Sequence, residues 1–350
     1  MTALIYHPLC LEHKNPQGHP ERSERLSATL KLLEERKIIS QLELISTKVA
    51  SEEIIGLVHD KGYIDNVRDV ARSGGGYLDA DTFVSPSSYE AAKMAVGGVL
   101  AGIDNLMSGK NDNVFCLVRP PGHHATTESG MGFCIFDNLA VGARYAINKH
   151  KVSKVLIIDW DAHHGNGIQD IFYRSQEILY ISLHQFPHYP GTGGLEEVGE
   201  GEGEGYTVNI PLPAGSGDDL YLQAFDKIIM PLAAAFEAQL VMVAAGYDGH
   251  FADPLASLNL TTSGYARMTG EILSLAAFSG KKVIVSLEGG YELTALSYSV
   301  LATIAQLAGL SDPVDDPFDS VPRSIGLERA SEGRKILDLV ARHLNKYWEF

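Results

Sequence analysis

The stretch DWDAHHGNG, residues 159–167, gathers side chains that bind metals or transfer protons. Asp159, Asp161 and His163 alternate along it, and alternate residues of an extended strand point to the same side. Buried carboxylates at a strand end need a cation or hydrogen-bond donors, and zinc accepts both carboxylate and imidazole ligands. The stretch therefore predicts half of a metal site, with Asp248 as the best third ligand. The alternative is that these acids only cap neighbouring loops.

Two other loops carry side chains suited to acid–base chemistry. His123 and His124 follow a stiff Pro-Pro-Gly turn, and histidine titrates near neutral pH. Tyr291 follows two glycines, and a phenolic hydroxyl can donate a hydrogen bond to a developing oxyanion. Taken singly, each would be read as an ordinary loop or core residue. Their occurrence in the same chain as the metal-ligand pattern favours a catalytic role for these residues.

Short apolar runs precede these loops, and such runs are typical of parallel strands that are buried on both faces. The runs are 113–118, 154–159, 178–183, 239–246 and 281–290. Helical patterns lie between most of them, which favours βαβ units. In open parallel sheets ligands bind beyond the carboxyl ends of the strands, so we expect the polar loops to converge there.

Two helices have clear sequence signals. Residues 20–38 carry leucines at helical spacing, and Pro20 is suited to the first turn. Residues 85–109 predict a helix with Ser85 as its N-cap and Pro86 at its first position.

Composition narrows the class of protein. The chain has 350 residues, 45% of them hydrophobic, which suits one large α/β domain or two small ones. Its net charge of −16 argues against nucleic acid as a partner and is compatible with cationic ligands. The three cysteines form no disulfide framework, and no signal peptide or membrane span is evident. These features predict a cytoplasmic protein that does not bind membranes.

Four motifs in fixed order carry a family resemblance: RPPGHH, DWDAHHGNG, AGYDGHFADP and EGGY. They resemble the zinc-dependent histone deacetylase superfamily, in its class II-like, bacterial or archaeal branch. GHPERSERL and SLHQFPHYPGTGG also resemble it, over about residues 7–310, with a connector and a helix in 311–350. The resemblance implies an arginase/deacetylase fold: a single α/β domain over residues 1–350, with a central parallel sheet of about eight strands and helices on both faces.

The resemblance also implies roles. Three residues would bind zinc, with iron(II) as the alternative metal: Asp161, His163 and Asp248. Five residues would serve catalysis: His123, His124, Tyr291, Asp159 and Asn166. Among these, His124 would act as general base and then acid, Tyr291 would stabilise the oxyanion, and Asp159 would hold His123. Asn166 stands where class I relatives carry aspartate.

Further expectations concern structural monovalent cations, usually potassium, and the substrate tunnel. The first cation would contact Asp159, Asp161, His163, Ser182 and Leu183. The second would contact the backbone carbonyls of Phe172, Ser175, Ile178 and Tyr206. The tunnel for an acyl-lysine arm would be bordered by Gly132, Phe133, Tyr189 and Leu255.

Together these expectations imply a zinc-dependent amidohydrolase that removes acetyl or other acyl groups from lysine side chains of proteins or peptides. The alternative is a deacetylase of acetylpolyamines or other small N-acyl amines, although Leu255 replaces the glutamate gatekeeper of eukaryotic polyamine deacetylases. A catalytically inactive acyl-lysine-binding module conflicts with the retained ligands, histidines and tyrosine. Gly165, in place of an arginase-type aspartate, argues against a two-manganese ureohydrolase. Acyl-chain preference and homo-oligomerisation stay open.

Overall fold

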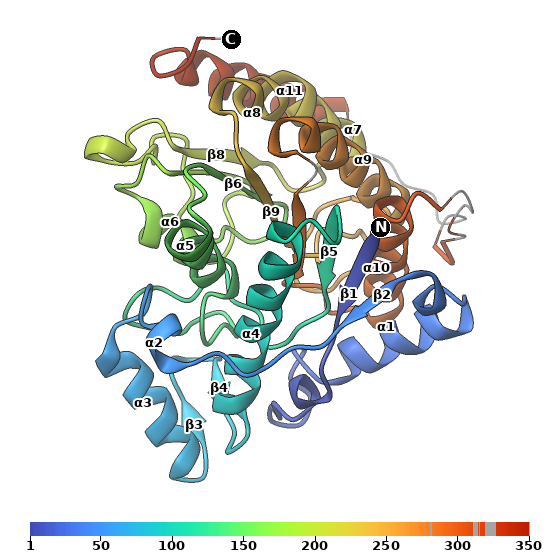
Figure 1. The fold of residues 1–350 in the computed structure, drawn as a ribbon. Coiled ribbons are helices and arrows are strands. Elements are labelled where there is room, and N and C mark those ends of the chain that lie inside the picture. Colours follow the sequence, from blue (N-terminus) through green and yellow to red (C-terminus); the bar gives the residue numbers. More distant parts are fainter. Residues whose placement is uncertain (281, 311–313, 315, 319–326, 350) are drawn as a thin grey trace.

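One sheet of eight parallel strands forms the centre of the protein (Figure 1). The computed structural model describes residues 1–280, 282–310, 314, 316–318 and 327–349. The strand order is β2-β1-β5-β10-β9-β6-β7-β8. The strands of this sheet are β1 (Thr2–Ile5), β2 (Glu43–Ile45), β5 (Asn113–Cys116), β6 (Val155–Asp159), β7 (Ile178–Gln185), β8 (Thr207–Leu212), β9 (Leu240–Ala245) and β10 (Val283–Leu287). The expected fold class is confirmed.

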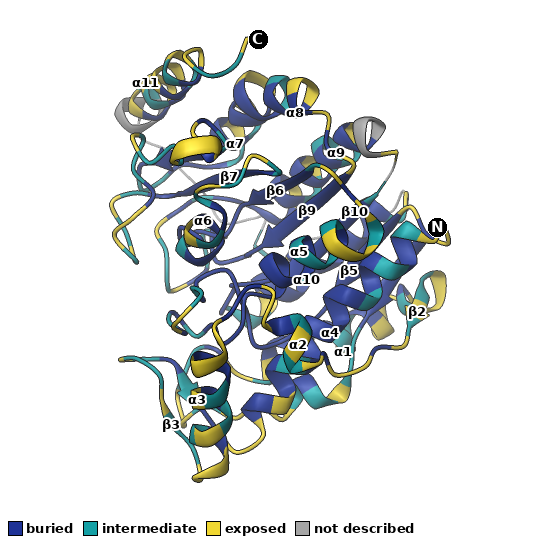
Figure 2. Cartoon of the chain, turned by 60° about the vertical axis from the view of Figure 1, so that its left-hand side comes forward, coloured by how far each residue is buried: buried dark blue, intermediate teal, exposed yellow. Residues whose placement is uncertain are grey.

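Helices cover both faces of the sheet because both faces are apolar. Alternate residues of one strand enter different cores: Phe115 packs in one cluster, and Val114 and Cys116 pack in the other. Figure 2 shows the central strands as buried, whereas the exposed residues lie mostly on the outer helices, the loops and the edge strand β2. The helices are α1 (Glu24–Glu35), α2 (Glu52–Ile55), α3 (Lys61–Arg72), α4 (Ser88–Met107), α5 (Asn138–His150), α6 (Asn166–Phe172), α7 (Asp218–Ala224), α8 (Met230–Phe236), α9 (Thr262–Ser279), α10 (Leu293–Leu307) and α11 (Leu327–Leu344).

Smaller elements complete the chain. A two-stranded antiparallel hairpin pairs β3 (Gly76–Tyr77) with β4 (Phe83–Val84). Single turns of 3₁₀-helix cover Pro8–Leu11, Ile39–Gln41 and Gly201–Gly203, and a π-helical turn, Phe225–Ile229, joins α7 to α8. No helix in the described part of the chain is long and apolar enough to cross a bilayer.

The register of the sheet aligns the ends of the strands that precede the polar loops. Asp159 at the end of β6 pairs with Ser182 of β7 and with Ala244 of β9. Ala245, one residue further along β9, pairs with Leu287 of β10. Because these strands are parallel, the loops that follow β6, β9 and β10 start from one edge of the sheet.

Two predicted helix starts were wrong. The first helix begins at Glu24 rather than near Pro20, because Glu21 turns inward and binds buried arginines. The helix expected from Ser85 begins at Ser88, because the Ser85 hydroxyl bonds to the Ser88 hydroxyl and does not cap a helix. Most of the expected connector after residue 310 lies outside the described residues, whereas the C-terminal helix is present as α11.

Gly97 of α4 provides a test of this packing. A Cβ atom at Gly97 would lie 1.8 Å from the backbone oxygen of Lys48, so Gly97→Ala forces two backbone segments apart. We expect the free energy of unfolding, measured by urea denaturation, to fall by about 2 kcal/mol or more. The matched control is Gly62→Ala in α3, where a Cβ atom meets nothing within 4 Å and stability should stay level or rise slightly. Equal stability of the two variants would contradict the packing.

Candidate active site

Two carboxylates and one imidazole meet at the carboxyl ends of β6 and β9. The Nδ1 atom of His163 lies 3.1 Å from Asp161 Oδ1 and 3.0 Å from Asp248 Oδ2. Both aspartates are fully buried, and His163 is 9% exposed. The structure thus brings the three predicted ligands together, with one donor atom of each within 4.8 Å of the others.

The surrounding backbone orients these carboxylates. Gly289 N–H donates to Asp161 Oδ2 at 2.8 Å, and Ala162 N–H donates to Asp248 Oδ1 at 2.9 Å. A Cβ atom at Gly246 or Gly289 would come within 2.5 Å of Asp161 Oδ2, so only glycine allows this close approach. The glycines of the AGYD and EGGY motifs therefore make room for the carboxylates.

The electrostatics of this group fit a bound cation. Burial alone would lower the pKa of His163, but the carboxylates of Asp248 and Asp161 outweigh it and raise that pKa to about 10. Burial and the neighbouring Asp161 raise the pKa of Asp248. The site thus draws positive charge to the point between the two carboxylates, and its donor set suits zinc.

The histidine pair follows β5 and lies beside this group. The rings of His123 and His124 are 4.0 Å apart. His123 Nδ1 lies 3.1 Å from Asp159 Oδ2, and His124 Nδ1 lies 2.8 Å from Asn166 Oδ1. In each pair the oxygen can accept the Nδ1 proton, which leaves Nε2 as the free nitrogen of the ring.

The two histidines differ in charge. Burial lowers the pKa of His123, but the carboxylates of Asp161 and Asp159 outweigh it and raise that pKa well above its ordinary value. Burial, together with His123 and His163, lowers the pKa of His124 well below its ordinary value. At neutral pH His124 is therefore the neutral member of the pair and can accept a proton.

A cavity of about 220 Å³ opens onto this group from the surface. It is lined by Asp81, His124, Gly132, Phe133, His163, His188, Tyr189, Leu255 and Tyr291. The ring of Phe133 packs edge-on to Tyr291 at 5.7 Å, and the ring of Tyr189 packs edge-on to His124 at 5.3 Å. A Cβ atom at Gly132 would lie 2.4 Å from His124, so glycine keeps this wall open. All four residues predicted to border the tunnel thus line one cavity.

The first set of residues predicted for a monovalent cation shares Asp161 and His163 with the metal-ligand group. Asp159 Oδ2 accepts from Tyr180 Oη at 3.0 Å as well as from His123, and Ser182 Oγ lies 2.9 Å from His184 Nδ1. In the second set, Ser175 N–H donates to the Phe172 carbonyl, which places two of its members side by side. The cation-binding roles of both sets stay predictions.

Sequence reasoning missed residues that hold the Tyr291 loop. Asp253 Oδ2 accepts from the backbone N–H of Tyr291 at 2.6 Å and of Glu292 at 2.9 Å. Arg25 donates from Nε to the Gly290 carbonyl at 2.6 Å, and its guanidinium lies 5.0 Å from the centre of the Tyr291 ring. The sequence signal for these two residues was their position in motifs: Asp253 lies in AGYDGHFADP, and Arg25 lies in GHPERSERL.

Two further contacts were also not foreseen. Glu288 Oε2 accepts from the backbone N–H groups of Gly122 and His123, so it links the Tyr291 loop to the histidine loop. His188 stacks on His163 at 4.9 Å, and its Nε2 lies 3.0 Å from the Leu255 carbonyl. Glu288 lies in the EGGY motif and His188 in SLHQFPHYPGTGG, but the local sequence does not show their partners, because each partner lies far away along the chain.

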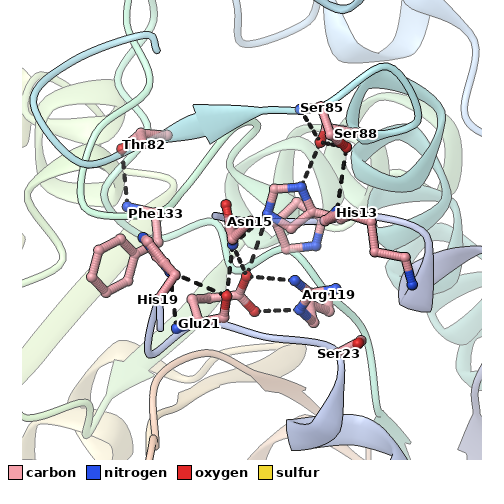
Figure 3. Close-up of polar contacts among 12 residues, drawn as sticks. His13, Asn15, His19, Glu21, Ser23, Thr82, Ser85, Ser88, Arg119 and Phe133 are labelled. Atoms are coloured by element: carbon pink, nitrogen blue, oxygen red, sulfur yellow. Dashed lines mark hydrogen bonds and ion pairs between the residues drawn. The ribbon is translucent and has the colours of Figure 1, made fainter. Parts of the chain in front are cut away.

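Glu21 lies at the centre of a buried polar network under the N-terminal loop (Figure 3). Its Oε1 accepts from Arg25 at 3.1 Å and from Arg119 at 2.5 Å, and its Oε2 accepts from Arg119 and Asn15, each at 2.8 Å. Burial would raise the pKa of Glu21, but Arg119, His13 and Arg25 outweigh it and hold that pKa well below its ordinary value. The network joins the segment before α1 to the ends of β5 and β10.

Comparison with known proteins identifies the class to which this fold and site belong. The histone deacetylase domain family matches residues 19–307, so the chain belongs to the histone deacetylase family. The crystal structure of the HDA15 HD domain superposes with a TM-score of 0.89 at 35% identity, covering 99% of this chain and 96% of that one. The family expected from the motifs is confirmed.

Three relatives illustrate the range of the family. A probable deacetylase of Archaeoglobus fulgidus is 38% identical over 100% of this chain and 99% of its own length. A histone deacetylase-like amidohydrolase of Pseudomonas aeruginosa is 39% identical over 91% of this chain and 88% of its own. The human polyamine deacetylase HDAC10 is 37% identical over 95% of this chain and 52% of its own. The names of these relatives share deacetylase chemistry, and the human relative is named for a polyamine substrate.

Replacing Glu21 tests the buried network. Glu21→Ala leaves Arg25 and Arg119 buried without their carboxylate, and breaking a buried pair in this way costs about 3–5 kcal/mol. We expect that loss in the free energy of unfolding, measured by urea denaturation. As a control, Glu90→Ala removes an exposed ion pair with Lys93 and should cost less than about 1 kcal/mol. A loss as small for Glu21 as for Glu90 would refute the network's contribution.

Proposed function

We propose that this protein is a zinc-dependent amidohydrolase that removes acetyl or other acyl groups from the side-chain amine of lysine in peptides or proteins. One observation carries the proposal: the buried group of Asp161, His163 and Asp248 lies at a cavity that also presents His124 and Tyr291. A metal-ligand set, a neutral base and a phenolic donor are the groups that amide hydrolysis requires.

The proposed roles follow from the contacts. A zinc ion held by Asp161, His163 and Asp248 would supply Lewis-acid polarisation of the amide carbonyl and of the attacking water. His124, neutral and fixed by Asn166, takes the proton of that water at Nε2 and returns it to the leaving amine. Tyr291 donates a hydrogen bond from its hydroxyl group to the oxyanion. Burial raises the pKa of Tyr291 well above its ordinary value, which keeps the phenol protonated.

His123 has a different proposed role. Asp159 holds it through Nδ1, and its raised pKa keeps it charged at neutral pH. A fixed positive charge beside the reacting carbonyl favours the developing negative charge of the transition state. Asp159 is therefore a positioning residue, which orients His123 and contributes its other contacts to the region proposed for the first potassium ion.

The cavity walls support a linear acylated arm as the substrate. Phe133 and Tyr189 both line the cavity, and the absence of a side chain at Gly132 leaves space beside His124 and Tyr189. Burying the four methylenes of a lysine side chain would contribute roughly 3 kcal/mol at about 0.8 kcal/mol each. This burial energy is the same whether a peptide or a small amine carries the acylated arm. We therefore assign the preference for lysine to residues at the mouth of the cavity.

A polyamine substrate is the second candidate, because one relative is named a polyamine deacetylase. Leu255 lines the cavity with an apolar side chain, at the position where the family resemblance places a glutamate in eukaryotic polyamine deacetylases. An apolar residue there offers no charge to a second ammonium group. We therefore favour acyl-lysine as the substrate.

We also propose that residues 1–350 act as one deacetylase domain.

Tyr291→Phe tests the reaction. Loss of one oxyanion donor lowers kcat by about 10²–10³-fold, and we expect this loss on an acetyl-lysine peptide with zinc-loaded protein. Tyr298→Phe on α10 is the control, because Tyr298 contacts Arg36 near the surface and should keep full activity. If the wild-type protein, loaded with zinc or iron(II), hydrolyses neither acetyl-lysine peptides, longer acyl-lysines nor acetylputrescine, the proposed function is wrong.

Leu255→Glu tests the substrate preference. A carboxylate at the mouth would attract the free ammonium group of an acetylated diamine, and a partly exposed ion pair is worth up to about 1 kcal/mol. We expect the ratio of kcat/KM for acetylputrescine to that for an acetyl-lysine peptide to rise severalfold. Leu255→Gln, which has the same shape without the charge, should leave the ratio close to that of the wild type. A ratio unchanged by glutamate would remove position 255 from substrate selection.

A further inference from the structure

A second group of metal-ligand type lies beside the first. It consists of His123 from the loop after β5, Cys134 further along the same loop, and Glu288 from the end of β10. One donor atom of each lies within 4.8 Å of the others, and all three residues are at most 3% exposed. Imidazole, thiolate and carboxylate are the three ligand types that zinc accepts.

Each member of this group has a donor atom to spare. Asp159 takes Nδ1 of His123, so Nε2 is the nitrogen left for another ligand. Glu288 Oε2 accepts from two backbone N–H groups, whereas Glu288 Oε1 is buried and has no hydrogen-bond partner among the described residues. Cys134 is a free thiol. A buried carboxylate oxygen without a partner is costly unless a proton or a cation satisfies it.

The charge around the group favours a cation. Asp159 and Asp137 are buried nearby, and Asp137 Oδ2 also has no hydrogen-bond partner among the described residues. Burial raises the pKa of Glu288 to about 7 and, with Glu288 beside it, the pKa of Cys134 as well. A divalent ion that binds here displaces the protons of its ligands into water.

We propose that His123, Cys134 and Glu288 form a second, inhibitory site for a zinc-type divalent cation, separate from the Asp161–His163–Asp248 site. On binding, the Cys134 sulfur, Nε2 of His123 and a carboxylate oxygen of Glu288 each form a bond to the metal, and the protons held by the thiol, by Nε2 and by the carboxyl group pass to water. The cation also occupies Nε2 of His123, which is 3.9 Å from Asp161 Oδ2 and therefore faces the first site. The second ion thus withdraws His123 from the catalytic pair, and excess zinc stops turnover.

The binding of the second ion is independent of the proposed function, whereas its inhibitory effect rests on it. The first site contains no cysteine, so thiolate-to-cobalt charge-transfer absorption reports a cysteine site alone. We would titrate the whole protein with Co²⁺ in a non-thiol reductant and follow this absorption. The expected result is no thiolate band with the first equivalent and a band that grows with the second.

Three variants make the test specific. Cys134→Ser should abolish the band and limit the protein to one bound ion, whereas Cys116→Ser, a buried control on β5, should behave like the wild type. Asp248→Asn, which damages the first site, should still give the band. Absence of a thiolate band in the wild type, or its persistence in Cys134→Ser, would overturn the second site.

Inhibition is measured separately with Zn²⁺ on acetyl-lysine peptide hydrolysis. Excess Zn²⁺ should inhibit the wild type and Cys116→Ser equally, and Cys134→Ser should need at least about tenfold more, a change of about 1.4 kcal/mol in binding. Equal inhibition of Cys134→Ser would refute the inhibitory role even if the ion binds. A protein that gives the thiolate band but hydrolyses no acylated amine would refute the proposed function and leave the second site standing.

Discussion

The structure is organised around buried carboxylates that need cations or hydrogen-bond donors beside them. Asp159, Asp161 and Asp248 are fully buried, and Glu288 is 1% exposed, all at the carboxyl ends of central strands. Burying an unpaired carboxylate is among the most costly events in folding. Backbone N–H groups, two histidines and, in our proposal, metal ions offset that cost. The need to satisfy these acids explains why the surrounding loops are rich in glycine and closely packed.

This constraint also explains which parts of the site could be predicted. The apolar runs indicate buried parallel strands, and the polar residues directly after them must then share one edge of the sheet. The spacing of Asp159, Asp161 and His163 predicts a common side, and the structure places these residues within hydrogen-bond reach of the predicted neighbours His123 and Asp248. These inferences need only local sequence and the topology of a parallel sheet.

The parts of the site that could not be predicted depend on contacts between segments that lie far apart in the sequence. Glu21 reads as an ordinary helix-start residue until Arg119, 98 positions later, is found beside it. Glu288 reads as a loop residue until its oxygen meets the backbone of Gly122. Cys134 and His123 are close in the chain, but only the end of β10 brings a third ligand to them. The wrong helix starts have a similar origin, because Glu21 binds the distant Arg119, and the Ser85 hydroxyl accepts from the backbone N–H of Lys14 besides its local contact with Ser88.

The position of β10 has a consequence for how the protein is made. This strand lies between β5 and β9 in the middle of the sheet, although it is the last strand of that sheet in the chain. During synthesis β5 and β9 emerge before β10, so the two halves of the sheet can join only after β10 has been made. The loop that follows β10 then delivers Glu288 and Tyr291 in a single step. A ribosome-bound chain therefore gains its central strand, its link to the histidine loop and its phenolic donor together, after the other strands of the sheet.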